Sequence, residues 1–265
     1  MTDQALPVFR FNVYQGHPVR AAFSTRSGGV SEGSLSTLNL GLHVGDDPNR
    51  VIENRHRFCG ALGIDAETLV CGEQVHGNRV AVVGRSDLGR GALDRASAIP
   101  LTDALVTADP GVPLAAFFAD CVPLLFYDPG QHVIGLAHAG WRGTENRIGL
   151  ETVRMMQERF GVEPYRLLAA IGPSIGACCY PVGNEVRIRF AAAFGADAGI
   201  LRQTVGEAWM LDLWAANRLV LLEAGLQPEN IELAGVCTAC HRTQYFSYRA
   251  HNGQTGRQAA LITLE

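Results

Sequence analysis

The chain has 265 residues, 47% hydrophobic and 18% charged, enough apolar material for the core of one large domain. The net charge of −4 gives no reason to expect nucleic acid or an anionic membrane as a partner. The first twenty residues lack the apolar stretch of a signal peptide, and no run approaches the roughly 20 apolar residues of a membrane span. We therefore expect a cytoplasmic protein, monomeric or homodimeric, with one domain over residues 1–265 and reduced cysteines.

The predicted strands and helices follow one another at irregular spacing. Apolar and β-branched runs predict strands at 19–24, 69–75, 79–83, 104–107, 114–118, 167–171, 231–236 and 258–264. Capping residues and helical apolar stripes predict helices at about 47–62, 144–159, 182–194 and 212–224, with Thr144 as a cap and Gly161 as a stop. This order favours an α+β fold with a mixed sheet over a regular βαβ repeat.

A β-hairpin is predicted where two apolar runs flank Pro129-Gly130. If the chain folds about this turn, Tyr127 faces His132 and Cys121 faces His138, with Cβ atoms roughly 4.5–5.5 Å apart. A thiolate and an imidazole at that separation can share a metal ion, or can act as nucleophile and base. The hairpin therefore predicts a reactive pair.

His76, in Gln74-Val75-His76-Gly77 after a predicted strand, would complete a Cys-His-His set. Three protein ligands with a fourth position open are typical of catalytic zinc sites. Spacing alone is weak evidence for His76 as a ligand, because a lone histidine at a strand end is more often a surface or hydrogen-bonded residue.

Arginine is the only residue that offers a permanent positive charge to an anionic substrate. All 22 basic residues are arginine, which excludes Schiff-base chemistry, a lysine base and a P-loop lysine. The glycine-rich loop 25–31, with Arg26 and Ser27, is a candidate oxyanion cradle. Arg142 lies in a second glycine-rich stretch, 137–144, and its guanidinium suits phosphate or carboxylate. The alternative is a pair of ordinary turns with solvated arginines.

The remaining cysteine pairs are assigned to packing. Cys237-Thr238-Ala239-Cys240-His241 matches a haem-attachment pattern, but that chemistry belongs to exported proteins. No second CxxC exists for a zinc finger, and the adjacent Cys178 and Cys179 are not expected to serve one ion.

Taken together and in order, segments along nearly the whole chain resemble the zinc-dependent purine nucleoside phosphorylase family of the YfiH/YlmD type, also called the laccase-domain or multicopper polyphenol oxidoreductase family. The matching segments are 23–31, 39–41, 74–77, 102–107, 119–123, 137–143, 171–173, 178–180 and 255–260. The resemblance implies packed mixed sheets flanked by helices, an α/β/β/α sandwich.

The same resemblance implies a zinc ion held by His76, Cys121 and His138 as the catalytic centre. The chemistry of these ligands also allows copper as a substitute metal. It also implies phosphorolysis of adenosine, inosine and methylthioadenosine, and deamination of adenosine, so purine nucleosides and phosphate are the expected partners. We expect substrate contacts from Arg26, Ser27, Asn39 and Arg142.

Three other functions remain open at this point. Cys121 and His138 can form a metal-free hydrolase or deamidase, which would not need His76. A copper-dependent polyphenol oxidase is less well supported, because none of the 8 histidines forms a His-x-His pair. A non-catalytic, zinc-stabilised binding protein is the third alternative.

Overall fold

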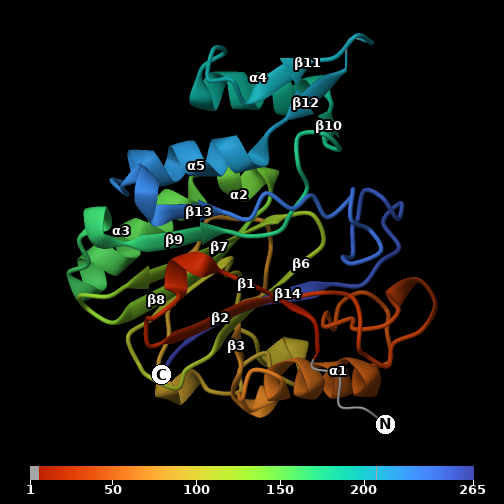
Figure 1. Ribbon diagram of the computed structural model, residues 1–265, viewed down its shortest axis with the longest axis vertical. Coiled ribbons are helices and arrows are strands. Elements are labelled where there is room, and N and C mark those ends of the chain that lie inside the picture. Colours follow the sequence, from red (N-terminus) through yellow and green to blue (C-terminus); the bar gives the residue numbers. More distant parts are fainter. Residues whose placement is uncertain (1–5, 207) are drawn as a thin grey trace.

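Two β-sheets packed face to face form the centre of the protein (Figure 1). The computed structural model describes residues 6–206 and 208–265. The five-stranded sheet has the spatial order β1 (Val8–Arg10), β2 (Val19–Ser24), β14 (Gln258–Leu264), β6 (Leu114–Phe118) and β3 (Val70–Cys71). The six-stranded sheet has the order β13 (Ile231–Leu233), β9 (Leu168–Ile171), β7 (Val122–Asp128), β8 (Val133–Ala139), β5 (Ala104–Thr107) and β4 (Val80–Val82).

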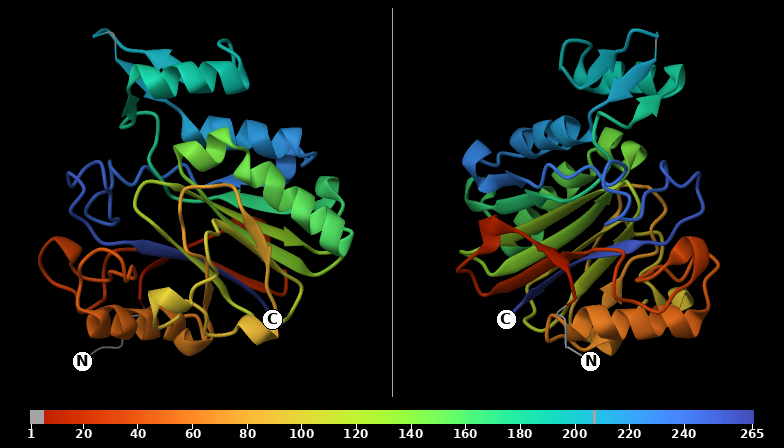
Figure 2. Two further views of the ribbon diagram at one scale, coloured as in Figure 1. Left: turned by 180° about the vertical axis from the view of Figure 1, so that it is seen from behind. Right: turned by 45° about the vertical axis from the view of Figure 1, so that its right-hand side comes forward.

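Helices cover the outer face of each sheet (Figures 1 and 2). Helix α1 (Pro48–Gly60) lies on the five-stranded sheet, and α2 (Trp141–Glu145), α3 (Ile148–Phe160) and α5 (Leu213–Glu223) lie on the six-stranded sheet. Short 3-10 helices occur at Asn12–Tyr14, Gly33–Leu35, Ala66–Thr68, Arg85–Asp87, Arg95–Ser97, Pro164–Arg166 and Pro228–Asn230. Both sheets contain parallel and antiparallel pairs, so the predicted α+β fold with mixed, helix-flanked sheets is confirmed.

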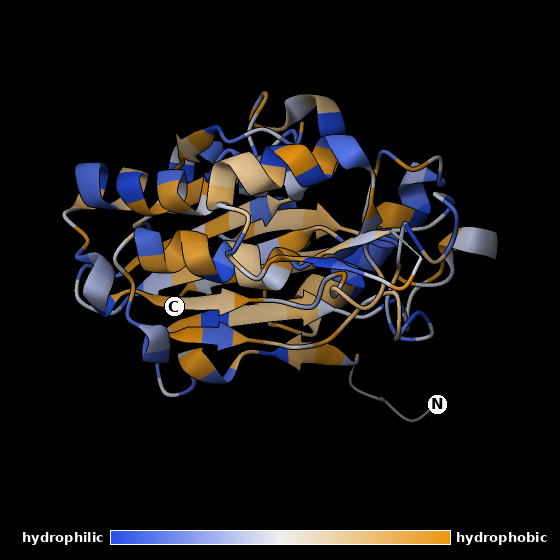
Figure 3. Ribbon diagram, turned by 90° about the horizontal axis from the view of Figure 1, so that it is seen from above, coloured by the Kyte–Doolittle hydropathy of each residue, from blue (hydrophilic) through white to orange (hydrophobic). Residues whose placement is uncertain are grey.

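The central strands are apolar throughout because both of their faces are buried. In β7, Leu124 and Phe126 pack among the helices, whereas Leu125 and Tyr127 pack between the two sheets. Alternation along the strand places successive side chains on opposite faces. Seen from above, hydrophobic strands lie beneath helices of mixed hydropathy (Figure 3).

A small third sheet was not expected from the sequence. Its strands are β10 (Pro181–Val182), β12 (Trp209–Leu211) and β11 (Leu201–Gln203), and helix α4 (Asn184–Phe194) lies beside it. This unit stands at the top of Figure 1, outside the sandwich. Its strands have only two or three residues each, too few to show a period in the sequence.

Several predicted boundaries agree with the structure, whereas the strands predicted at 69–75 and 231–236 are shorter, as β3 and β13, and one helix differs. Strands predicted at 19–24, 104–107, 114–118 and 258–264 coincide with β2, β5, β6 and β14. The single helix predicted from Thr144 is two helices, because Arg147 adopts a left-handed φ of 61° between α2 and α3. Thr144 lies inside α2, where its hydroxyl accepts a hydrogen bond from Asn217 Nδ2 (3.0 Å) and caps no helix.

The hairpin between β7 and β8 forms, but its predicted register was wrong. Pro123, not Cys121, lies opposite His138, and Tyr127 pairs with Ile134. The turn is displaced by one residue because Asp128 remains in the strand and its Oδ1 accepts a hydrogen bond from Gly130 N (3.0 Å). The resulting two-residue offset in pairing keeps each side chain on its original face, so Cys121 and His138 still meet.

Within the two described ranges, the helices are too short or too polar to cross a lipid bilayer.

Candidate metal centre and active-site cavity

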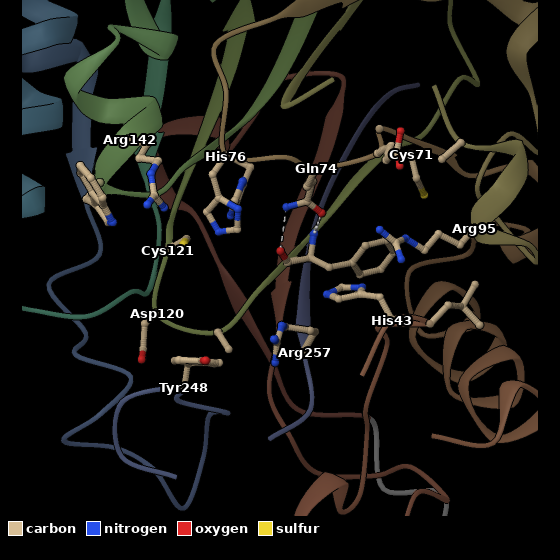
Figure 4. Close-up of a pocket in the computed structure, with 18 of the residues that line it drawn as sticks. His43, Cys71, Gln74, His76, Arg95, Asp120, Cys121, Arg142, Tyr248 and Arg257 are labelled. Atoms are coloured by element: carbon tan, nitrogen blue, oxygen red, sulfur yellow. Dashed lines mark hydrogen bonds between the residues drawn. The ribbon is translucent and has the colours of Figure 1, made fainter. Parts of the chain in front are cut away.

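Three side chains from distant parts of the chain converge at one point. His76 lies in the loop between β3 and β4, Cys121 directly precedes β7, and His138 is in β8. One ligand atom from each lies within 4.8 Å of the others, and His76 is exposed, Cys121 half-buried and His138 buried. Figure 4 shows His76 and Cys121 at the wall of a cavity. The structure thus brings together the three residues predicted as metal ligands.

Asp103 holds the loop that carries His76. Its carboxylate accepts hydrogen bonds from the backbone N–H groups of Val75 (3.1 Å), His76 (3.0 Å) and Gly77 (2.8 Å). His76 has a φ of 61°, a left-handed conformation that is unfavourable for a non-glycine residue. The three hydrogen bonds offset this cost and keep the imidazole at the site.

Asp103 also orients His138. His138 Nδ1 lies 2.9 Å from Asp103 Oδ1, and the backbone N–H of His138 donates to Asp103 O (2.8 Å). With Nδ1 engaged, Nε2 is the ring nitrogen left to bind a ligand, the arrangement typical of metal-binding histidines. Sequence reasoning missed this role of Asp103; the available signal was a carboxylate directly before the apolar strand 104–107.

Cys121 and His138 alter each other's protonation in the absence of a metal. Burial raises the pKa of Cys121, but the charge of His138 and hydrogen bonds from His138 and His76 outweigh it and lower this pKa to about 6. Burial lowers the pKa of His138, but the Cys121 thiolate and Asp103 raise it to about 9. The thiolate needed for metal binding or nucleophilic attack is therefore present at neutral pH.

The donor set and the space around it fit a metal ion. Two imidazoles and a thiolate suit zinc, and a site with three protein ligands leaves a fourth position open. Gly140 provides the room: a Cβ at this position would lie 3.1 Å from Cys121 Sγ and 3.0 Å from His76 Cδ2. Since Gly140 has an ordinary extended φ of −70°, space rather than backbone conformation calls for glycine.

The metal centre opens onto a cavity of about 520 Å³, within the range of small-molecule sites. Figure 4 shows Arg142 on one side of the cavity and Tyr248 and Arg257 on the other. The cationic and aromatic lining residues are Arg55, Arg95, Arg142, Arg249, Arg257, Phe117, Trp141, Tyr180 and Tyr248. In the part of the chain that the structure describes, Arg95, Arg142, Arg249 and Arg257 form no ion pair with a carboxylate. Their charges are thus not neutralised by a carboxylate of the described chain, although Arg249 Nη2 and Arg257 Nη1 already donate to backbone carbonyls.

Only one of the four predicted substrate contacts lines this cavity. Arg142 does so, with its guanidinium 4.3 Å from the centroid of the Trp141 ring. Arg26 and Ser27 lie elsewhere, and Arg26 Nη2 and Nε donate to the carbonyl of Ser36 (2.8 and 3.0 Å).

Asn39 is buried and does not line the cavity, but it holds the backbone of a residue that does. Its Oδ1 accepts hydrogen bonds from the backbone N–H groups of Gly41 (3.1 Å) and Arg257 (2.9 Å). Asn39 thus positions the backbone of Arg257, whose side chain lines the cavity.

Two carboxylates, Asp120 and Glu73, also line the cavity. Asp120 accepts hydrogen bonds from Thr238 Oγ1 (2.7 Å) on one oxygen and from the backbone N–H of Arg249 (2.7 Å) on the other. Glu73 Oε2 accepts one from the backbone N–H of Leu101 (3.2 Å). Asp120 therefore holds the loop beyond β13 against the segment that carries Cys121, just before β7, whereas Glu73 accepts fewer hydrogen bonds.

Known proteins resemble this chain over almost its full length. It is 43% identical over 243 residues to a purine nucleoside phosphorylase YlmD of Geobacillus stearothermophilus, covering 91% of this chain and 89% of that protein. It is 37% identical to an adenosine deaminase RL5 from an unknown prokaryotic organism, covering 89% and 90%. The crystal structure of YlmD from Geobacillus stearothermophilus superposes with a TM-score of 0.94 at 40% identity, covering 99% of this chain and 97% of that one.

A family model described as multi-copper polyphenol oxidoreductase laccase matches residues 20–265. With that match and these relatives, the chain belongs to the multi-copper polyphenol oxidoreductase laccase family, which includes the YlmD-type proteins.

Proposed function

We propose that this protein is a zinc-dependent purine nucleoside phosphorylase that acts on adenosine, inosine and methylthioadenosine and also deaminates adenosine. The observation that carries the proposal is an open three-ligand site, His76, Cys121 and His138, facing a cavity lined by four guanidinium groups that form no ion pair with a carboxylate of the described residues. The names of the relatives, purine nucleoside phosphorylase and adenosine deaminase, support the same class of substrate.

The arginines account for binding of phosphate. In phosphorolysis a phosphate oxygen attacks C1′ of the ribose while the glycosidic nitrogen leaves with its electron pair. Arg142, Arg249 and Arg257 line the cavity and present planar forks that match phosphate oxygens. Because the chain contains no lysine, arginine is the only side chain that brings a permanent positive charge to this role.

The aromatic side chains account for the orientation of the purine, and Asp103 accounts for the orientation of His138. Trp141, Tyr180 and Tyr248 offer ring faces and edges against which a flat purine can pack. A zinc ion held by His76, Cys121 and His138 would supply a Lewis acid at the end of the cavity. Asp103 keeps His138 Nε2 turned towards that point.

Deamination also requires a group that moves a proton. Of the two cavity carboxylates, Asp120 already accepts hydrogen bonds on both oxygens, whereas Glu73 accepts one on Oε2. We therefore assign proton transfer to Glu73. The variant Glu73→Gln should lose inosine formation and keep its zinc.

The test is incubation of the zinc-loaded protein with adenosine, with and without phosphate. Adenine that forms only with phosphate indicates phosphorolysis, and inosine indicates deamination. Arg142→Ala should raise the KM for phosphate, whereas Arg154→Ala, on the exposed face of α3, is the matched control. Full phosphorolysis by the metal-free protein, or none with any of the three nucleosides, would contradict the proposal.

One observation favours a second candidate, a metal-free cysteine hydrolase or deamidase. Cys121, His138 and Asp103 follow one another as nucleophile, base and orienting carboxylate. The position of His76 beside the same thiol favours the metal site instead, because a hydrolase has no need of it. Hydrolysis of amides or esters that survives chelation and is lost in Cys121→Ala would support the hydrolase.

The hypothesis that the protein is a copper-dependent polyphenol oxidase is tested on the same zinc-loaded and metal-free preparations. Copper can occupy a site of two imidazoles and a thiolate, so copper content and oxidation of a phenol are measured together. Phenol oxidation that tracks copper content would support it over the phosphorylase.

A further inference from the structure

Four cysteines outside the active-site cavity form a second cluster. The sulfur atoms of Cys178, Cys179, Cys237 and Cys240 all lie within 4.8 Å of one another. None of the four lines the cavity. The assignment of these residues to packing was wrong for Cys178 and Cys240, which are both exposed.

The fold removes the objection that adjacent cysteines cannot serve one ion. That objection holds in a strand, where neighbouring side chains point to opposite faces. Cys178 and Cys179 instead lie in a turn, closed by a hydrogen bond from Cys179 N to Gly176 O (3.0 Å). Their sulfur atoms lie 3.5 and 3.4 Å from Cys240 Sγ, so both reach the same neighbour.

The spacing of the sulfur atoms matches a tetrahedral metal site. With metal–sulfur distances of about 2.3 Å, the sulfurs of a tetrahedral site are about 3.8 Å apart. Two of the separations here are 3.4 and 3.5 Å, and every pair lies within 4.8 Å. A disulfide would employ only two of the four sulfurs. We propose that Cys178, Cys179, Cys237 and Cys240 bind a second zinc ion as a structural site, closed to substrate by its four thiolates.

The proposed site would join two loops that shape the cavity wall. Cys178 and Cys179 lie between β9 and β10, and Cys237 and Cys240 follow β13 in the blue part of the chain (Figure 1). The loops already meet through a bridge between Ser174 and Cys237, and Gly176 N donates to Cys237 Sγ (3.3 Å).

Each of the two loops connects the cluster to a residue that lines the cavity, Tyr180 in one case and Asp120 in the other. Tyr180, which lines the cavity, directly follows Cys179. Thr238, between Cys237 and Cys240, donates to Asp120, beside Cys121. A metal at the cysteines would therefore stabilise this wall of the cavity without contacting substrate.

The test is to measure the number of zinc ions per chain by elemental mass spectrometry, in protein purified without added metal. The unmodified protein should hold about two zinc ions per chain, Cys121→Ala and Cys240→Ser about one each, and the double variant about none. Cys240→His should keep the second ion, because imidazole replaces thiolate in Cys₃His sites.

If Cys240→Ser does not fold, the proposal is tested instead by replacing zinc with cobalt in Cys121→Ala, which retains all four cysteines of the cluster. Cobalt in Cys121→Ala should give the intense sulfur-to-metal absorption of an all-thiolate tetrahedral site. The proposal is overturned if Cys121→Ala binds no zinc and shows no such absorption, or if the protein as purified contains a disulfide among these cysteines. Neither result depends on nucleoside turnover, so this proposal and the proposed function fail separately.

Discussion

The two clusters of metal-ligating side chains are built on different parts of the fold. His138 is in β8, Cys121 directly precedes β7, and His76 lies on a loop that the buried carboxylate of Asp103 holds in place; all three face a cavity of about 520 Å³. The four cysteines sit on loops near the surface, and none lines the cavity. Similar donor atoms thus suit different functions. Three ligands beside a cavity leave a coordination position open for a substrate, whereas four thiolates fill the tetrahedral coordination shell of a metal ion.

Removal of the thiol from the three-ligand site should have the largest effect. Cys121→Ala leaves two imidazoles and should abolish metal retention at this site, together with phosphorolysis and deamination. Metal content and product formation are measured on the same preparation. Cys240→Ser, which removes a cysteine from the other cluster, should retain the metal at His76, Cys121 and His138. Equal loss of that metal in both variants would erase the distinction between the clusters.

Loss of the supporting carboxylate should have the next largest effect. Asp103→Asn keeps the size of the side chain but removes the charge that faces His138 and three backbone N–H groups. We expect metal affinity or activity to fall about 10- to 100-fold. A chelator competition measures the affinity, with Asp109→Asn, an exposed-loop carboxylate that accepts from Arg85 N, as the control. Unchanged affinity in Asp103→Asn would mean that the ligands need no such support.

The pH dependence of thiol reactivity separates two cysteines that line the same cavity. In the protein stripped of metal, the pKa of Cys121 is about 6, whereas burial raises the pKa of Cys71 to about 11. Because the thiolate is the reactive form, alkylation of Cys121 should rise about tenfold between about pH 5 and pH 7 and then level off. Cys71 should stay unreactive over this range. Peptide mass analysis after brief iodoacetamide treatment assigns each rate, and a midpoint for Cys121 near the ordinary thiol value would contradict the ion pair with His138.

A methyl group added at Gly140 should have the smallest effect on metal binding at the three-ligand site. It would lie 3.1 Å from Cys121 Sγ and 3.0 Å from His76 Cδ2, so both ligands must shift by a few tenths of an ångström. Gly140→Ala should therefore weaken metal binding by about tenfold or less with the fold intact. Gly183→Ala is a matched control, since Gly183 also precedes a helix with an extended φ of −73° and has open space around it. Identical metal affinity in the two variants would show that the site tolerates crowding.

The sequence was enough for elements with a strong local signal. The apolar runs of β2, β5, β6 and β14 coincide with their predicted bounds, Asp47 caps the start of α1, and Gly161 ends α3 as expected. The ordered motifs also indicated the family and the ligand set of His76, Cys121 and His138. The bounds of these elements depend on alternation, capping and turn chemistry, which act over a few residues, whereas the family and the ligand set were inferred from the resemblance.

Only the tertiary structure decided which distant groups meet. It placed Asp103 against His138, 35 residues away, and moved Arg26 out of the cavity that Arg142 lines. It brought Cys178 to Cys240 across 62 residues of sequence and let two adjacent cysteines converge through a turn. Local periodicity determines how a segment folds, but such contacts depend on how the sheets stack and where their loops end. That packing is a property of the whole chain.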